Sequence, residues 1–356
     1  AVSGMGCSAA GFSIPWCREN GIDMIPSDGY LPACVPAMVG TWAAALRRFG
    51  RLSFGEVLAP AIELAEHLAA LTYPSINRFF FTCGGGEATD SSVKMSRAYW
   101  KLRGQPDKTK VISRIDGYHG VTLAAMSATG MSAYWPLFEP RVPGFLHIPS
   151  PDPYRYNAPP GVSQGIGAAN ELEQAILAEG ADTVAMFLAE PVQGAGGVIV
   201  PQDDYFPRIR EICDQYDVLL VADEVITAFG RTGTLFALDH WGIEPDIIQF
   251  AKAITSGYVP FGGIGINDTI AAALDDSGRV WMHAYTYSAH PVGCAVALRN
   301  LRIIEDEDLP GQCAAKGDRL IGAPRTALEH DIRKSARGCA HVEADAAFGR
   351  YVKGIE

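Results

Sequence analysis

The 356-residue sequence has few charged residues, and they are more often acidic than basic. Charged residues make up 19% of the chain, and 29 Lys and Arg stand against 40 Asp and Glu, for a net charge of −11. Binding to nucleic-acid phosphates or to an anionic membrane surface usually relies on an excess of basic residues. We therefore expect neither a nucleic acid nor a membrane among the partners of this protein.

The sequence also lacks long apolar runs and paired cysteines. Apolar runs such as 184–189 and 218–222 are far shorter than the roughly 20 residues that span a bilayer. Residues 1–11 contain no basic residue, so they do not resemble a secretory signal. The eight cysteines include no C-x-x-C pair, which argues against a zinc site and a small disulfide scaffold. We expect a cytoplasmic protein with reduced thiols and no metal.

Short apolar runs alternate with amphipathic helical patterns between residues 72 and 306. The apolar runs show little polar alternation, as is typical of strands that are covered on both faces. They are Arg78–Thr82, Lys110–Ser113, Val184–Ala189, Val218–Ala222 and Ile247–Phe250. The helical patterns are Glu87–Leu102, Glu171–Glu179, Tyr205–Tyr216 and Pro291–Ile304. This order predicts an α/β domain with a mostly parallel sheet flanked by helices.

Two further segments flank this domain. Residues 1–71 are helical in pattern, with one helix predicted over 36–49 and a second that begins at a capping box of Ser53 and Glu56. Pro60 is expected in or near the first turn of the second helix. Residues 307–356 show no strong pattern. We therefore predict three parts, 1–71, 72–306 and 307–356, the last being a shortened C-terminal part.

Residues suited to binding or chemistry follow three of the predicted strands, at the edge where parallel sheets bind their ligands. Gly84, Gly85 and Gly86 lie between a strand and a helix, which favours an anion cradle, although many such turns are only tight loops. Asp223 ends the run VLLVAD, where an acid can bind a metal, cap a loop or hold a protonated ring nitrogen.

Lys252 follows another strand-like run. Burial would lower the pKa of its amine and free it as a nucleophile, although most lysines reach solvent. A phosphate cradle, an acid at a strand end and a buried lysine together match the requirements of pyridoxal phosphate.

Several motifs occur in order between residues 73 and 306. They are FTCGGGEATD, GYHG, AEPVQGAGG, ADEV, FAKAITSGY and YTYSAHP. In this region the chain closely resembles the class III aminotransferases, which are fold-type I pyridoxal-phosphate enzymes, and most of all their ω-amino-acid:pyruvate branch. The resemblance implies ping-pong transfer of an amino group from an ω-amino acid or amine to a keto acid such as pyruvate.

The resemblance also implies roles around the cofactor ring. Lys252 would bind the cofactor covalently and then move a proton between the substrate Cα and the cofactor C4′. Asp223 would form an ion pair with the ring nitrogen and keep it protonated. Val225 would pack on one face of the ring and Tyr118 on the other, with His119 beside Tyr118.

The remaining roles concern the phosphate and the subunit arrangement. Gly85 and Gly86 would bind the phosphate through their N–H groups, and Glu190 would belong to the network on the cofactor side. Thr286 would contact the phosphate bound by the neighbouring subunit, which implies a homodimer with shared active sites. Relatives that act on ornithine-like substrates carry Glu and Gln where this chain has Ala195 and Ile226, so the apolar pair favours the ω-amine branch.

The chain departs from the family pattern at several positions. Gly86 stands where many relatives have a serine. Ala228 and Ala289 replace common glycines, which is tolerable only if their φ angles are negative.

Larger departures lie at the two ends of the chain. Residues 29–68 resemble an internal stretch of γ-glutamyltranspeptidases without that family's catalytic threonine. The arginine expected for a substrate carboxylate has no clear match among Arg333, Arg337 and Arg350. A protein that binds the cofactor but is catalytically impaired, or a chimeric fragment, therefore stays open as an alternative.

Overall fold

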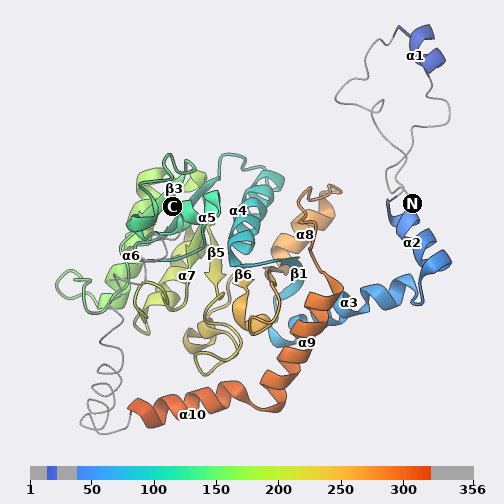
Figure 1. Cartoon of the computed structure of the whole chain (residues 1–356). Coiled ribbons are helices and arrows are strands. Elements are labelled where there is room, and N and C mark those ends of the chain that lie inside the picture. The colour runs from blue at the N-terminus through green and yellow to red at the C-terminus, as the bar shows by residue number, and fades with distance from the viewer. Residues whose placement is uncertain (1–13, 22–37, 322–356) are drawn as a thin grey trace, which may run out of the picture.

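The computed structural model describes residues 14–21 and 38–321 (Figure 1). Part of the segment that resembles γ-glutamyltranspeptidases, residues 29–37, lies outside the described residues. So do residues 322–356, which include Arg333, Arg337 and Arg350. Within the described part of the chain, no helix combines the length and the apolar character that crossing a membrane requires.

A seven-stranded sheet forms the centre of the fold. Its strands are β1 (Ile76–Thr82), β2 (Lys110–Arg114), β3 (Phe145–Ile148), β4 (Val184–Ala189), β5 (Leu219–Asp223), β6 (Ile247–Phe250) and β7 (Gly262–Asn267). They pair in the order β1-β7-β6-β5-β4-β2-β3, and only β7 runs antiparallel to its neighbours. The predicted α/β class with a mostly parallel sheet is confirmed.

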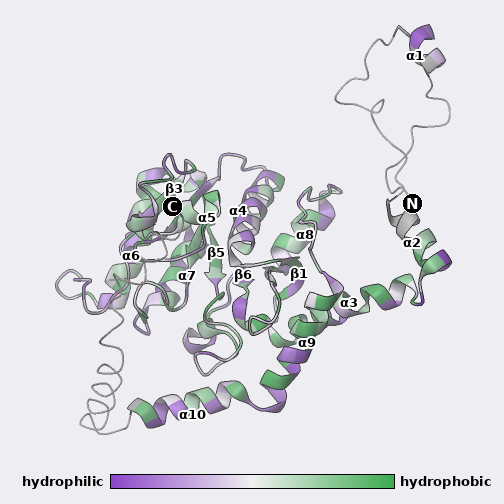
Figure 2. Ribbon diagram, viewed as in Figure 1, coloured by the Kyte–Doolittle hydropathy of each residue, from purple (hydrophilic) through white to green (hydrophobic). Residues whose placement is uncertain are grey.

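Helices cover both faces of this sheet. They are α3 (Phe54–Leu71), α4 (Gly85–Leu102), α5 (Leu123–Ala128), α6 (Gln164–Glu179), α7 (Tyr205–Gln215), α8 (Asp268–Asp276) and α9 (Pro291–Asp306). Shorter or flanking helices are α1 (Ile14–Glu19), α2 (Met38–Phe49), α10 (Leu309–Ile321), η1 (Ser132–Tyr134), η2 (Ala181–Thr183), η3 (Ala237–Trp241) and η4 (Lys252–Ile254). Hydrophobic and hydrophilic residues mix along most helices in Figure 2, as expected when only one face packs on a sheet.

The core consists of two clusters of apolar side chains, one on each face of the sheet. Phe187 of β4 packs into the cluster that includes α3, α6, α7 and α9, whereas its neighbour Leu188 packs into the cluster that includes α4 and α8. Every residue of β4 is buried. Burial on both faces explains why the sequence of this strand shows no polar alternation.

The capping box at the start of α3 is confirmed. The Ser53 N–H donates to the Glu56 carboxylate at 2.6 Å, and the Glu56 N–H donates to Ser53 Oγ at 3.2 Å. Pro60 is the seventh helical residue and so lies in the second turn, further in than expected. Leu64 and Leu68 of α3 are fully buried in the main core cluster, so this helix shares its core with the sheet.

The topology brings five chain segments to one edge of the sheet. Strands β1, β2, β4, β5 and β6 all point the same way, because two antiparallel pairings through β7 restore the direction of β1. The residues that follow each of these strands therefore meet at their shared carboxyl end, where open α/β sheets bind ligands.

Candidate active site

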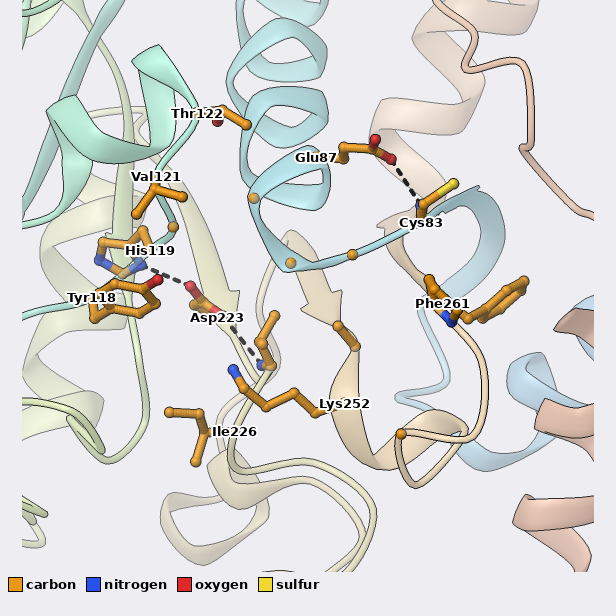
Figure 3. A pocket seen from close by; sticks show the side chains of 18 of the residues that line it. Cys83, Glu87, Tyr118, His119, Val121, Thr122, Asp223, Ile226, Lys252 and Phe261 are labelled. Carbon is orange, nitrogen blue, oxygen red and sulfur yellow. Dashed lines mark hydrogen bonds and ion pairs between the residues drawn. The ribbon is translucent and has the colours of Figure 1, made fainter. Parts of the chain in front are cut away.

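A pocket of about 580 Å³ opens at this edge of the sheet (Figure 3). Its volume lies within the range of small-molecule and cofactor sites. Eight of the nine residues singled out from the sequence line it: Gly85, Gly86, Tyr118, His119, Glu190, Asp223, Val225 and Lys252. The structure thus gathers residues from five separate segments around one cavity.

The N-terminus of α4 forms one wall of the pocket. Gly84 precedes the helix, and the first intrahelical bond runs from the Ala88 N–H to the Gly84 carbonyl at 3.1 Å. The earlier N–H groups of the helix therefore have no partner one turn back and lie at its positive end, as an anion site requires. A Cβ on Gly120, which has a φ of +120°, would lie 2.9 Å from the Gly86 Cα, so the backbones approach too closely for a side chain.

A buried Asp–His pair lies at the end of β5. His119 Nδ1 and Asp223 Oδ2 are 2.7 Å apart, and both side chains are nearly inaccessible to solvent. The other carboxylate oxygen of Asp223 accepts the N–H of Val225 at 3.1 Å. The His119 backbone is itself fixed, because its N–H donates to Thr129 Oγ1 and its carbonyl accepts from Thr89 Oγ1, each at 2.9 Å. The acid is therefore held rigidly against the pocket.

Lys252 lies two residues after the end of β6, and its side chain extends into the pocket toward Asp223 (Figure 3). The expectation of a buried lysine is wrong, since the side chain is exposed to the open cavity. The surrounding protein nevertheless lowers the pKa of its amine by desolvation, and the carboxylates of Asp223 and Glu190 act in the opposite direction. Lys252 also has a φ of +45°, an uncommon backbone conformation for a residue with a side chain.

Glu190 links two loops at the base of the pocket. One carboxylate oxygen accepts the Tyr118 N–H at 2.9 Å, and the other accepts the Gly194 N–H at 3.0 Å. Burial raises the pKa of this carboxyl group, while His119 opposes the shift. Glu190 therefore fixes the loop that carries Tyr118 and His119.

Thr286 is the one predicted site residue that does not line the pocket. It is exposed, in a segment that packs against the start of α4 through a hydrogen bond of 3.1 Å from the Tyr285 hydroxyl to the Glu87 carbonyl. Its proposed contact is with a neighbouring subunit, so its role stays a prediction. In the same segment Ala289 has a φ of +53°, contrary to the expectation of a negative angle, whereas Ala228 is not among the residues with positive φ.

Sequence reasoning missed some residues around the pocket. Cys83 and Glu87 lie beside the glycine cradle, where the Glu87 carboxylate accepts the Cys83 N–H at 2.8 Å. Phe261 begins the approach to β7, a strand that the sequence analysis did not identify. The signal for Glu87 was available, because an acid in the first turn is favoured at the positive end of a helix.

The residues present fit pyridoxal phosphate. The α4 N-terminus suits its phosphate, the Asp223–His119 pair suits a protonated ring nitrogen, and Lys252 suits an aldehyde. A Cβ on Gly85 would approach Val225 Cγ1 to 3.1 Å, so only glycine leaves Val225 free to form a flat wall for a ring. Each group faces the same cavity from a different segment.

Comparison with known proteins identifies the family. The sequence model described as aminotransferase class-III matches residues 33–339. The chain belongs to the class III aminotransferase family. The family and a pyridoxal-phosphate-bound structural neighbour indicate pyridoxal phosphate as the cofactor of this class III aminotransferase.

Two curated relatives illustrate the match. A putrescine–pyruvate aminotransferase of Pseudomonas aeruginosa is 43% identical over 300 residues, which cover 83% of this chain and 65% of that protein. A probable aminotransferase of Mycobacterium tuberculosis is 46% identical over 271 residues, which cover 75% of this chain and 58% of that protein. This class III aminotransferase thus spans about 58–65% of the length of these relatives.

Solved structures agree with this assignment. An (S)-enantioselective ω-transaminase from Thermomicrobium roseum is 50% identical with a TM-score of 0.71, and the match covers 73% of this chain and 58% of that one. An amine transaminase from an uncultivated Pseudomonas species, solved in its pyridoxal-phosphate-bound form, is 39% identical with a TM-score of 0.72, covering 76% and 62%. These neighbours share the predicted fold.

Proposed function

We propose that this chain is a pyridoxal-phosphate-dependent aminotransferase that moves an amino group from an ω-amino acid or amine to a keto acid such as pyruvate. The observation that carries the proposal is the position of Lys252. Its amine extends into a cavity whose wall holds the buried Asp223–His119 pair, with the N-terminus of α4 on another side. The match to a putrescine–pyruvate aminotransferase supports the donor and acceptor classes.

When bound, pyridoxal phosphate supplies an aldehyde that accepts amino groups and a ring that takes up electrons from the substrate Cα. Asp223 would hold a proton at the ring nitrogen, and His119 keeps the Asp223 carboxylate in one orientation through the 2.7 Å contact. Lys252 would take the proton from the substrate Cα and deliver it to the cofactor C4′. Its lowered pKa helps, because a base works best when part of it is unprotonated at the working pH.

The pocket walls favour a substrate with an apolar portion. Ile226, Val259 and Phe261 line the cavity with apolar surface. Such a wall accepts the carbon chain of an amine or ω-amino acid without leaving a buried polar group of the protein unpaired.

A homodimer is part of the proposal. Thr286 is exposed on a segment anchored to the start of α4, so a second copy of the chain can reach it. In that arrangement Thr286 would contact the phosphate bound by the neighbouring subunit. Light scattering of the cofactor-loaded protein tests the dimer, and Thr286→Val should weaken cofactor binding if the contact exists.

The decisive experiment loads the full chain with pyridoxal phosphate and supplies an amine donor with or without pyruvate. Putrescine and β-alanine are the donors to compare, and alanine formation is the readout. The proposal predicts turnover that needs pyruvate and disappears in Lys252→Ala. Donor consumption with carbon dioxide release and no need for pyruvate would instead indicate a decarboxylase.

A second candidate is a protein that binds the cofactor without turning over. It is favoured by the pocket lining, which among the described residues contains no arginine for a substrate carboxylate. The two candidates differ in the first half-reaction. An active enzyme loses the absorption of its lysine-bound cofactor when donor is added, whereas a binding protein retains it.

A further inference from the structure

Arg114 is a buried cation that contacts Glu190, one of the residues that line the pocket. It is the last residue of β2 and is 1% exposed, with its guanidinium over the rings of Tyr205 and Phe206 at 5.8 and 6.0 Å. Its Nη2 donates to the backbone carbonyl of Glu190, and among the described residues its Nη1 has no hydrogen-bond partner. A buried charge is costly unless it is compensated. The groups that Arg114 contacts therefore indicate its role.

The contacts of Arg114 close a ring between the ends of β2 and β4. Its carbonyl accepts the Gly117 N–H at 3.1 Å, at the start of the loop that carries Tyr118. The Tyr118 N–H donates to the Glu190 carboxylate at 2.9 Å, and the Glu190 carbonyl accepts from the Arg114 guanidinium. Arg114 thus contacts the Tyr118 loop through its carbonyl and the main chain of Glu190 through its guanidinium.

The charge of Arg114 also acts on Glu190. Burial raises the pKa of Glu190 and Asp223 adds to this, whereas His119, the hydrogen bond from the Tyr118 N–H and, least of these, Arg114 lower it. Glu190 in turn raises the pKa of Lys252, together with Asp223. The charged groups that face Glu190 are therefore Arg114, His119, Asp223 and Lys252.

We propose that Arg114 is a positioning residue for the amino transfer. It fixes the main chain of Glu190 through the hydrogen bond to its carbonyl, so that the Glu190 carboxylate stays in place to hold the Tyr118 loop on the side of the pocket that Lys252 enters. Arg114 touches neither substrate nor cofactor. The catalytic part of this inference rests on the proposed function, whereas the ring of contacts is testable without it.

The chain offers a matched control in Lys108, two residues before the start of β2. Lys108 is 2% exposed and is likewise a buried cation. Its ammonium, which has three N–H donors, lies within hydrogen-bonding distance of four backbone carbonyls, those of Ala181, Val184, Tyr216 and Asp217. Lys108→Met therefore removes a positive charge that is as deeply buried as that of Arg114 but does not contact the residues of the pocket.

The first test uses the cofactor-free protein and measures amide hydrogen exchange in the peptides that contain Tyr118 and Gly194. Arg114→Met should speed exchange of these amides by about ten-fold, because their acceptor is no longer fixed. Arg114→Lys should have a smaller effect, and Lys108→Met should leave both peptides unchanged. Unchanged exchange in Arg114→Met, or equal acceleration in Lys108→Met, overturns the proposal.

The second test measures the pH dependence of the first half-reaction in the loaded enzyme. Arg114→Met should move the acidic limb of the pH–rate profile to higher pH, since Glu190 then protonates more readily. In Arg114→Lys the acidic limb should lie close to its wild-type position, and in Lys108→Met it should not move. A limb that stays in place in Arg114→Met contradicts the electrostatic role, and a wild-type protein without any half-reaction refutes the proposed function instead.

If Arg114→Met does not fold, the same two measurements on Glu190→Gln test the proposal. This variant keeps an oxygen acceptor for the Tyr118 N–H but carries no charge. It should leave exchange of Tyr118 slow and abolish the acidic limb. A Glu190→Gln enzyme that retains the wild-type limb overturns the proposal.

Discussion

Gly85 and Gly86 are adjacent in the cradle, but the structure predicts different consequences for adding a methyl group to each. A Cβ on Gly85 would lie 3.1 Å from Val225 Cγ1 and 3.2 Å from Val225 Cγ2. Val225 is 9% exposed and packed, so it must move into the pocket. Overpacking of this kind costs about 1–3 kcal/mol, which corresponds to roughly 5- to 150-fold weaker cofactor binding if the cost falls on the bound state.

Gly86→Ala is the matched comparison. Its Cβ would lie 3.4 Å from Thr122 Cγ2, an ordinary contact, so cofactor affinity should stay within about three-fold of the wild type. Gly86→Ser adds a hydroxyl donor and should tighten binding by about three- to ten-fold. The assay is a fluorescence titration of cofactor-free protein with pyridoxal phosphate, with thermal unfolding as a check on folding. Wild-type affinity in Gly85→Ala, or a larger loss in Gly86→Ala, would refute the placement of the ring against Val225.

Three further predictions concern backbone strain, pH and the Asp–His pair. Ala289→Gly removes the strain of a φ of +53°, whereas Ala228→Gly removes a buried methyl group at a residue without a positive φ. Ala289→Gly should therefore lower the free energy of unfolding by about 1.5 kcal/mol less than Ala228→Gly does. Equal effects of the two variants in urea unfolding would contradict this. Burial raises the pKa of Glu224 to about 7 from 4.5. The neutral form is therefore favoured in the fold, and unfolding free energy should fall as pH rises from 4.5 to 7, by an amount on the order of 3 kcal/mol. Glu224→Gln should reduce this dependence of the unfolding free energy on pH. An unchanged pH dependence in the variant would contradict the assignment to Glu224. His119→Asn frees the Asp223 carboxylate and should slow the half-reaction about ten-fold in stopped-flow measurements, with donor affinity little changed.

Much of the fold could be predicted from the sequence because its strands are buried on both faces. The runs at β4 and β6 have the bounds that the sequence predicted, since every residue in them is apolar or packed. Strand β7 was missed because its sequence, GGIGIN, is rich in glycine, a poor strand former. Its glycines are required by close packing, as a Cβ on Gly265 would lie 2.7 Å from Ile76 Cγ2.

The site residues that directly follow a predicted strand could be predicted from the sequence. Features of the site that depend on tertiary contacts could not. Asp223 and Lys252 end apolar runs, so their meeting at one sheet edge follows from topology. The exposure of Lys252 and the positive φ of Ala289 depend on packing that no local pattern encodes. Arg114 shows the same limit, because a charge at the end of a strand gives no sign that it will be buried against Glu190.

The most direct test of the account is an absorption spectrum of the full chain mixed with pyridoxal phosphate, recorded for the wild type and for Lys252→Ala. We expect the wild type to show a visible band of lysine-bound cofactor that borohydride reduction removes, with the cofactor then recovered on the peptide that contains Lys252. Lys252→Ala should lack the band while still binding the cofactor noncovalently. A band of equal strength in both proteins, or its absence from a folded wild type, would contradict the account.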